Sequence, residues 1–205
     1  MPFSLRPERP AYAEATIKNS RFIARLGYVD GEDAAVAFIR GVRDAERGAG
    51  HHCFAYVVGD DEESRIERFS DDGEPSGTAG APILNALKAN DLANTAAVVS
   101  RHYGGVKLGT GGLARAYSGT VSAAIAEAHL HPRSRWLVFR LAADHTEAGR
   151  LEAELRGRGV EVSDVHYGEQ AVLTLVCADE SRLTAAVGEL TAGRGNLIPA
   201  GHIWR

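Results

Sequence analysis

The spacing of apolar residues divides the chain into alternating helices and strands. From 32 to 47, Val36, Ile39 and Val42 recur at helical spacing and would share one face. A short apolar run without that spacing, Thr95–Ser100, favours a buried strand. These patterns predict, before residue 130, an extended segment over 13–29, helices over 32–47, 78–89 and about 110–128, and strands over 52–58, 65–70 and 95–100.

The part of the chain after residue 132 has a simpler order of elements. The pattern there predicts strands over 135–142, 160–167, 170–177 and 197–204, and helices over 146–157 and 180–192. This βαββαβ order is that of the ferredoxin-like fold, and a length of about 73 residues suits it. A break at 129–133 separates the two parts. The sequence therefore predicts an α+β protein of two domains, residues 1–132 and 133–205.

Composition narrows the functional classes. Of the 205 residues, 44% are hydrophobic, which is enough for packed cores and argues against disorder. The net charge of −4 gives no strong overall attraction to nucleic acid, so a polyanion would have to meet a local patch. Cys53 and Cys177 form no C-x-x-C pair, and we expect no metal and no cofactor. No apolar run approaches the ~20 residues that cross a bilayer, and no signal peptide is evident, so we expect a cytoplasmic protein with no membrane partner.

The stretch from Val98 to Arg115 carries the strongest chemical signal. No carboxylate occurs between Asp91 and Glu127, and the order there is strand, glycine-rich loop, helix. Glycines let backbone amides approach a ligand, and the start of a helix offers unpaired N–H groups and partial positive charge. This pattern suits phosphate or another anion, although it is neither a Walker loop nor G-x-G-x-x-G. The alternative is a tight, closely packed turn. The residues concerned are Arg101, His102, Tyr103, Gly104, Gly105, Lys107, Gly109, Gly111, Gly112 and Arg115.

A second candidate is an acidic segment that precedes the helix predicted over 78–89. It contains Asp71, Asp72, Glu74 and Ser76. Clustered carboxylates can hold Mg²⁺ or serve as acid and base. The favoured interpretation is structural: Ser76 or Thr78 caps the following helix, and Glu74 lies near its positive end.

Several segments together resemble the IMPACT/YigZ family over nearly the whole chain. They are SRFIA (20–24), HCFAY (52–56), DDGEPSGTAG (71–80), VVSRHYGGVKLGTGGLARAYS (98–118) and the ferredoxin-like second half. His102 departs from the family pattern, which usually has an aromatic residue there. The resemblance implies an N-terminal βαβ fold of the left-handed type, as in ribosomal proteins, GHMP kinases and domain IV of elongation factor G. It implies a C-terminal domain similar to domain V of that factor.

The resemblance also implies a role in translation, because eukaryotic relatives act in translational control by competing for an activator of an initiation-factor kinase. The leading hypothesis is a translation regulator that binds RNA, the ribosome or a translation-associated protein. The glycine loop would contact phosphate, with Tyr103 as a stacking surface. The cations and histidine expected to take part are Arg21, Arg101, His102, Lys107 and Arg115.

Two other functions compete with this hypothesis. In a Mg-dependent enzyme acting on a phosphorylated small molecule, the glycine loop would cradle phosphate, Asp71, Asp72 or Glu74 would bind Mg²⁺ or act as base, and Arg101 would neutralise developing charge. The chain lacks the glycine- and serine-rich ATP loop of GHMP kinases, which favours a protein that is not an enzyme. The third hypothesis is a protein-interaction module that works through the C-terminal sheet or its helices.

Overall fold

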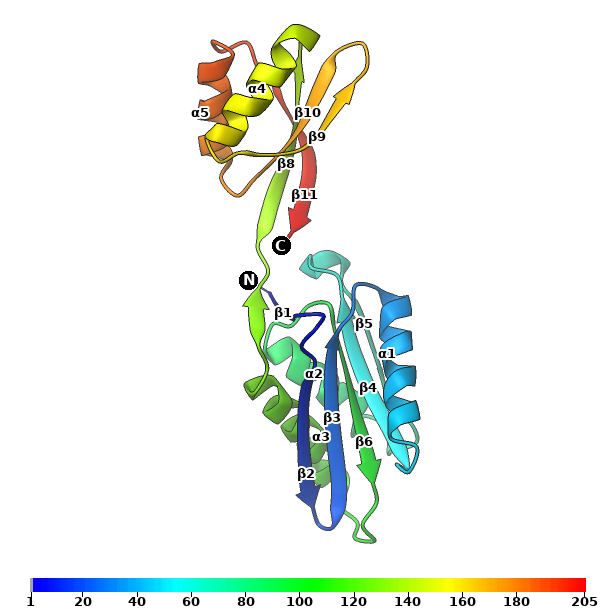
Figure 1. Cartoon of the computed structure of the whole chain (residues 1–205). Helices are drawn as coiled ribbons and strands as arrows, with labels where there is room; N and C mark the ends of the chain where they lie inside the picture. The colour runs from blue at the N-terminus through cyan, green and yellow to red at the C-terminus, as the bar shows by residue number, and fades with distance from the viewer. Residues whose placement is uncertain (1) are drawn as a thin grey trace. The chain divides into compact units, whose positions relative to one another are not determined.

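The computed structural model describes residues 2–205, apart from the side chain of Glu62. The chain divides into two compact units, Met1–Arg133 and Ser134–Arg205, each of mixed α and β structure (Figure 1). The predicted fold class, an α+β protein of two domains, is confirmed. No helix in the described part of the chain is long and apolar enough to cross a membrane.

The N-terminal unit is built on a five-stranded antiparallel sheet with the strand order β2-β3-β6-β4-β5. Helix α1 covers one face of this sheet, and α2 and α3 cover the other (Figure 1). Two short strands, β1 and β7, pair with each other beside it. The elements are β1 (Phe3–Leu5), β2 (Ala11–Ile17), β3 (Ser20–Tyr28), α1 (Glu32–Ala45), β4 (His51–Val58), the 3₁₀ turn η1 (Glu62–Ser64), β5 (Ile66–Ser70), α2 (Gly80–Ala89), β6 (Thr95–His102), α3 (Thr110–Ala126) and β7 (Leu130–Pro132).

The central strand β6 is buried on both faces of the sheet. Ala97 and Val99 belong to the core shared with α2 and α3, whereas Ala96 and Val98 belong to the core under α1. Because helices cover both faces, the strand has no polar side to alternate with an apolar one. This explains why the sequence shows a continuous apolar run there.

The predicted buried faces of helices α3 and α1 have different outcomes. The stripe Leu113, Tyr117 and Val121 of α3 is buried, as predicted. In α1 one residue of the predicted stripe is wrong: Val36 is 49% exposed, and its neighbour Ala35 lies in the core. The small side chain of Ala35 gave no apolar signal strong enough to show where the stripe begins.

The segment predicted as one extended piece over 13–29 is a hairpin of β2 and β3. Lys18 and Asn19 form its turn with φ of 46° and 64°. Two consecutive residues with positive φ match the right-handed twist of the paired strands. Strands β1 and β7 were not predicted, and β7 occupies part of the predicted break at 129–133. At three residues each, neither strand is long enough to show an alternating pattern.

The C-terminal unit has the βαββαβ order predicted from the sequence. Its four antiparallel strands lie in the order β11-β8-β10-β9, and both helices pack on one face of the sheet (Figure 1). Phe139, Leu151, Leu173 and Leu183 contribute to the core between helices and sheet. The elements are β8 (Arg135–Ala143), α4 (His145–Gly157), β9 (Glu161–Tyr167), β10 (Ala171–Cys177), α5 (Glu180–Leu190) and β11 (Leu197–Trp204).

We predict that Gly104→Ala destabilises the protein. A Cβ at Gly104 would lie 2.0 Å from the backbone oxygen of Asn19, in the turn between β2 and β3, so the backbone would have to move. Overpacking of this kind costs about 1–3 kcal/mol, measured as the free energy of unfolding in urea by circular dichroism. Gly119→Ala in α3 is the control: its Cβ would meet nothing within 4 Å, and alanine favours a helix by up to about 1 kcal/mol. Equal stability of the two variants would contradict the prediction.

Candidate functional site

The glycine-rich loop connects β6 to α3. The loop is held to the β2–β3 hairpin by Gly104, whose N–H donates to Oγ of Ser20 at 3.2 Å. Gly109 precedes α3 with φ of 73°, a conformation that favours glycine. The loop is thus packed tightly at Gly104, whereas most residues between Gly104 and Gly109 are exposed.

A pocket of about 560 Å³ lies against this loop. It is lined by residues from both segments that the sequence analysis treated as separate candidates, the glycine-rich stretch and the acidic segment. The lining residues are His51, Glu74, Pro75, Arg101, Tyr103, Lys107, Leu108, Gly109, Thr110 and Leu113. Five of these lining residues were not predicted for the site, because a single apolar or polar residue carries no signal for a pocket: His51, Pro75, Leu108, Thr110 and Leu113.

Arg101 is a buried, paired residue in the wall of this pocket. It is 5% exposed, and its Nη1 donates to Oε1 of Glu74 at 2.6 Å. The hydroxyl of Tyr117 donates to the same oxygen at 2.8 Å. The Arg101 guanidinium also lies 5.4 Å from the ring centroid of Phe22 and 5.3 Å from that of Tyr103. The charge of Arg101 is thus compensated within the protein, and the residue supports the pocket from inside.

Among the cations predicted for the site, Lys107 and Arg115 carry charge that no described residue compensates. Both side chains are exposed, and neither has an ion pair or side-chain hydrogen bond with any described residue. Lys107 lines the pocket, whereas Arg115 lies beyond it in α3. The first turn of α3 contains no acidic residue, and no side chain caps its N-terminus. Lysine and unpaired helix N–H groups at one pocket form an arrangement that can bind an anion.

Two further residues predicted for the binding surface do not line the pocket. Arg21 donates to both carboxylate oxygens of Glu14, at 2.5 and 2.8 Å, and with a hydrogen bond from Tyr12 this lowers the pKa of Glu14 to about 2. His102 faces Glu46, with its Nε2 3.8 Å from the carboxylate. Of the predicted glycines, Gly109 lines the pocket, Gly104 and Gly105 lie in the loop, and Gly111 and Gly112 lie in the first turn of α3.

Asp71 caps α2, which corrects the prediction of Ser76 or Thr78 as the cap. Its Oδ1 accepts the N–H groups of Ala79 and Gly80 at 2.9 and 2.8 Å, and its Oδ2 accepts that of Gly77 at 2.8 Å. Burial disfavours the charged form, but these three bonds outweigh it and lower the pKa of Asp71. Ser76 is exposed. The first N–H groups of α2 are therefore bonded by a residue that lies several positions earlier in the chain. A prediction that considers only the residues directly before the helix misses such a cap.

Asp72 holds the same loop to β4 and α1. Its Oδ2 accepts the backbone N–H of His52 at 2.6 Å, and its Oδ1 accepts from Arg43 at 2.8 Å. The carboxylates proposed for Mg²⁺ binding or acid–base work are therefore engaged by the protein itself. Among the side chains that the structure describes, no three His, Cys, Asp or Glu are arranged to hold a metal ion.

Cys53 lies beneath the same loop and is not a reactive thiol. It is fully buried, and its Sγ donates to the backbone oxygen of Asp71 at 3.0 Å. Burial raises the pKa of the Cys53 thiol to about 12. A thiol that stays protonated at neutral pH does not act as a nucleophile.

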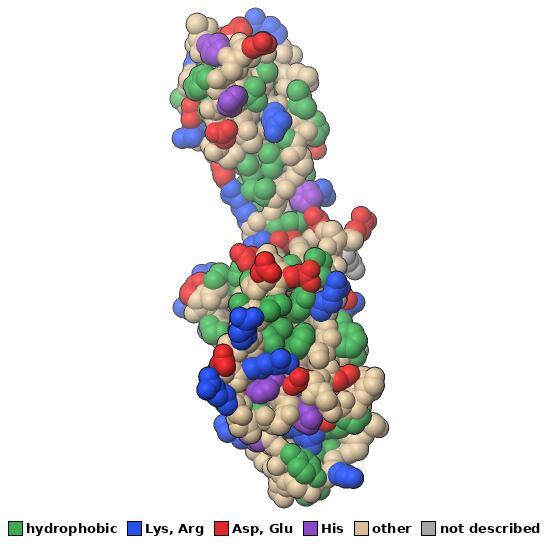
Figure 2. All heavy atoms as spheres, turned by 90° about the vertical axis from the view of Figure 1, so that its right-hand side faces the viewer, with side chains coloured by type: hydrophobic (Ala, Val, Ile, Leu, Met, Phe, Trp, Pro, Cys, Tyr) green, Lys and Arg blue, Asp and Glu red, His purple; other side chains and the backbone are tan. Residues whose placement is uncertain are grey.

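The distribution of charge on the surface of the N-terminal unit is mixed. On the face shown in Figure 2, Lys, Arg and His side chains gather over the middle of this unit, with acidic side chains interspersed. A uniformly basic face of the kind that holds duplex nucleic acid is not present on this view. Attraction of an anion to this unit therefore depends on the charged groups that line the pocket.

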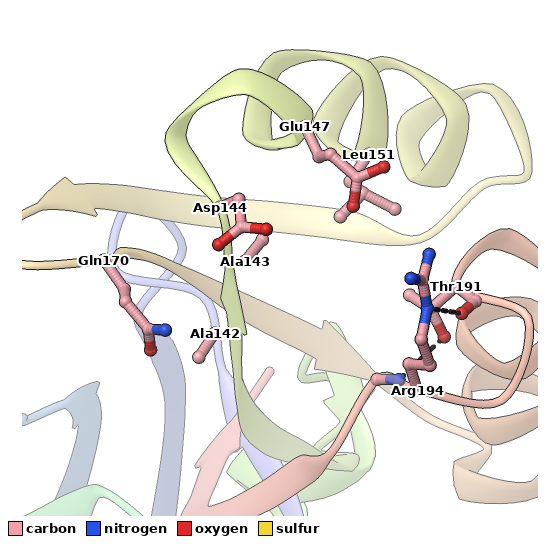
Figure 3. Close-up of a pocket in the computed structure, with 9 residues that line it drawn as sticks. Ala142, Ala143, Asp144, Glu147, Leu151, Gln170, Thr191 and Arg194 are labelled. Carbon is pink, nitrogen blue, oxygen red and sulfur yellow. Dashed lines mark hydrogen bonds between the residues drawn. The ribbon is translucent and has the colours of Figure 1, made fainter.

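The C-terminal unit has a smaller pocket of about 200 Å³ (Figure 3). Asp144 and Glu147 reach it from the start of α4, and Gln170 from the loop between β9 and β10. Arg194 reaches it from the loop after α5, where its Nε donates to the backbone oxygen of Thr191 at 3.2 Å. Two carboxylates and one guanidinium give these walls an excess of negative charge. This pocket is therefore a poorer anion site than the pocket beside the glycine-rich loop.

Comparison with known proteins gives matches along the whole chain. The family model of the Impact N-terminal domain matches residues 18–125, and that of a domain of unknown function, DUF1949, matches residues 141–194. The chain is 41% identical to the IMPACT family member YigZ of Escherichia coli (strain K12), over 95% of this chain and 96% of that protein. It is 38% identical to the IMPACT family member YvyE of Bacillus subtilis (strain 168), over 90% and 85% respectively.

Alignments with solved structures also cover much of the chain. The crystal structure of a hypothetical protein aligns with a TM-score of 0.73 at 34% identity, over 98% of both chains. The two-domain translational regulator Yih1 aligns with a TM-score of 0.42 at 24% identity, over 59% of this chain and 48% of its own.

Fold and site together define a two-domain α+β protein with a glycine-rich loop beside a pocket in its first domain and a ferredoxin-like second domain. The chain belongs to the IMPACT family. The family resemblance inferred from the sequence motifs is thereby confirmed.

We predict that Arg101→Met lowers the free energy of unfolding by about 3–5 kcal/mol, because Glu74 would remain buried without its cation. The double variant Glu74→Gln/Arg101→Met should recover part of this loss. Arg47→Met is a matched control, since Arg47 and Asp44 form an exposed pair worth at most about 1 kcal/mol. Urea denaturation at pH 7 measures all three. An Arg101→Met variant as stable as Arg47→Met would show that the buried pair is not needed.

We also predict a pH-dependent difference between the wild type and Asp71→Asn. The lowered pKa of Asp71 means that the carboxylate stabilises the fold above its ordinary value of 3.8, and that this contribution is lost as the pH falls through the lower folded value. The variant should be less stable at pH 7 by about 1 kcal/mol, because hydrogen bonds to a charged acceptor are stronger.

The difference should shrink as the pH falls below 3.8. Unfolding in urea at pH 7 and pH 3 measures it. The exposed Asp44→Asn serves as the control, with little effect at either pH. A difference that grows in acid would contradict the prediction.

Proposed function

We propose that this protein is a cytoplasmic translation-regulator-like protein that binds RNA, free or within the ribosome, through its glycine-rich loop. The observation that carries the proposal is the position of Lys107 and the uncapped start of α3 at one pocket. Phosphate is the anion that RNA presents at every nucleotide, and lysine and backbone N–H groups are common phosphate ligands in nucleic-acid complexes.

The charge distribution supports a local contact. The whole chain carries a net charge of −4, whereas the span between Asp91 and Glu127 contains no carboxylate. Arg115, one turn into α3, adds an exposed cation to this span. A few phosphate contacts of this kind give modest affinity that depends strongly on salt.

Family membership supports the biological setting. The chain belongs to the IMPACT family, and the motif resemblance implies a part in translational control. A protein component of the translation machinery that presents an acidic segment is the competing partner. It would use the same cations but would not require phosphate.

Only some of the predicted cations are suitable for a mutational test of RNA binding. Arg101 is buried and paired, so its substitution would disturb folding as well as any ligand contact. Lys107 and Arg115 are exposed and without partners in the described part of the chain, which makes them suitable for charge removal.

We predict that Lys107→Ala/Arg115→Ala weakens binding of single-stranded RNA and of ribosomes, measured by fluorescence anisotropy and by co-sedimentation. If each residue neutralises one phosphate, the slope of log K against log salt should fall by about 1.4 in magnitude. Arg6→Ala/Arg9→Ala removes the same charge from exposed residues and should leave the slope unchanged. Unchanged binding by the first double variant, or an equal loss in both, would refute the proposal.

A further inference from the structure

The pocket beside the glycine-rich loop combines an apolar wall with a cationic end. Pro75, Leu108 and Leu113 form apolar lining, while Lys107 and the start of α3 provide the positive end. A bare phosphate would leave the apolar wall exposed to water. We propose that this pocket binds one unstacked nucleotide of a single strand of RNA, with its base against Tyr103 and its phosphate at Lys107. This inference rests on the proposed function and names the form of RNA that the site would recognise.

Tyr103 lines the pocket and lies against the buried Arg101. Its side chain is 55% exposed, although the Arg101 guanidinium lies 5.3 Å from its ring centroid. Arg101 is in turn held by Glu74 at 2.6 Å and lies 5.4 Å from the ring centroid of Phe22. A ring with a guanidinium on one side and more than half of its surface exposed is a ready stacking surface for a base.

The buried side of the pocket has an unused hydrogen-bond donor. Arg101 lines the pocket and is 5% exposed, yet its Nε has no hydrogen-bond partner among the described residues. Buried donors are rarely left unpaired. An acceptor group on a ligand that fills the pocket would pair this donor. This is independent of the argument from the helix terminus.

The carboxylate of Glu74 does not oppose this ligand. Its Oε1 accepts hydrogen bonds from Arg101 and Tyr117, and the pair with Arg101 leaves no net charge at this side of the pocket. The phosphate would lie at the other end, where Gly109 and Thr110 line the pocket at the uncapped start of α3. Negative charge is favoured there by the helix dipole and the unpaired N–H groups.

The geometry favours a single strand over a duplex. A base within a duplex has both faces covered by its neighbours, so it cannot stack on Tyr103 without being extruded. The pocket volume of about 560 Å³ has room for a base and its phosphate. The ligand class is therefore an unpaired nucleotide in a loop, bulge or single-stranded end.

The test uses the full-length protein and fluorescence anisotropy with three labelled probes of one sequence. These are a single-stranded oligoribonucleotide, the same strand in a duplex, and a single strand with abasic positions that keep every phosphate. Wild-type protein should bind the single strand about 5- to 150-fold more tightly than the abasic strand, the range that one stacked base provides. It should also prefer the single strand to the duplex.

Variants of Tyr103 connect the preference to the pocket. Tyr103→Phe retains the ring and should bind like the wild type. Tyr103→Ala should lose the preference for the intact single strand over the abasic strand, with an unchanged salt slope, because no phosphate contact is removed. Tyr103 is 55% exposed, so this variant should fold, and circular dichroism verifies that it does.

The outcomes separate the two proposals. If wild-type protein binds the abasic strand as tightly as the intact one, or if Tyr103→Ala behaves like Tyr103→Phe, the nucleotide pocket is refuted. The proposed function survives that result when Lys107→Ala/Arg115→Ala still lowers RNA affinity and its salt slope. Binding of an acidic peptide without binding of any oligonucleotide would overturn both.

Discussion

The carboxylate of Glu74 meets the guanidinium of Arg101 and the hydroxyl of Tyr117 inside the N-terminal unit, and the candidate site depends on this contact. The three residues come from the loop before α2, from strand β6 and from helix α3. A buried charge that loses its partner costs several kcal/mol, so none of these segments can move away without a penalty. The two ends of the glycine-rich loop and one wall of the pocket are fixed relative to each other for that reason.

Some charged residues near this contact stabilise the fold, and others remain free to bind a ligand. Glu74 compensates the charge of Arg101 inside the protein. The carboxylates of Asp71 and Asp72 accept hydrogen bonds from backbone N–H groups and from Arg43. Residues that resemble a reactive cluster in the sequence thus hold the loops in place. The positive groups still available to a ligand are Lys107, Arg115 and the start of α3, and the proposed function rests on them.

Much of the fold could be predicted because helical and strand periodicity are properties of neighbouring residues. The α3 stripe and the βαββαβ order of the C-terminal unit show this. The errors have local causes too. Ala35 was too small to define the α1 stripe, and strands β1 and β7 were too short for alternation to be visible. The cap of α2 was missed because Asp71 acts from outside the positions directly before the helix.

The sequence by itself determined that this is a two-domain α+β protein of the IMPACT family, with an acid-free, glycine-rich loop between a strand and a helix. Only the tertiary structure decided which charges in that loop are free. Glu74 lies 27 residues before Arg101 in the chain, outside the acid-free span, yet the fold brings it within 2.6 Å. The interaction between two charges depends on their distance in space. Folding brings together residues that are far apart in the chain, and the sequence shows only their separation along the chain.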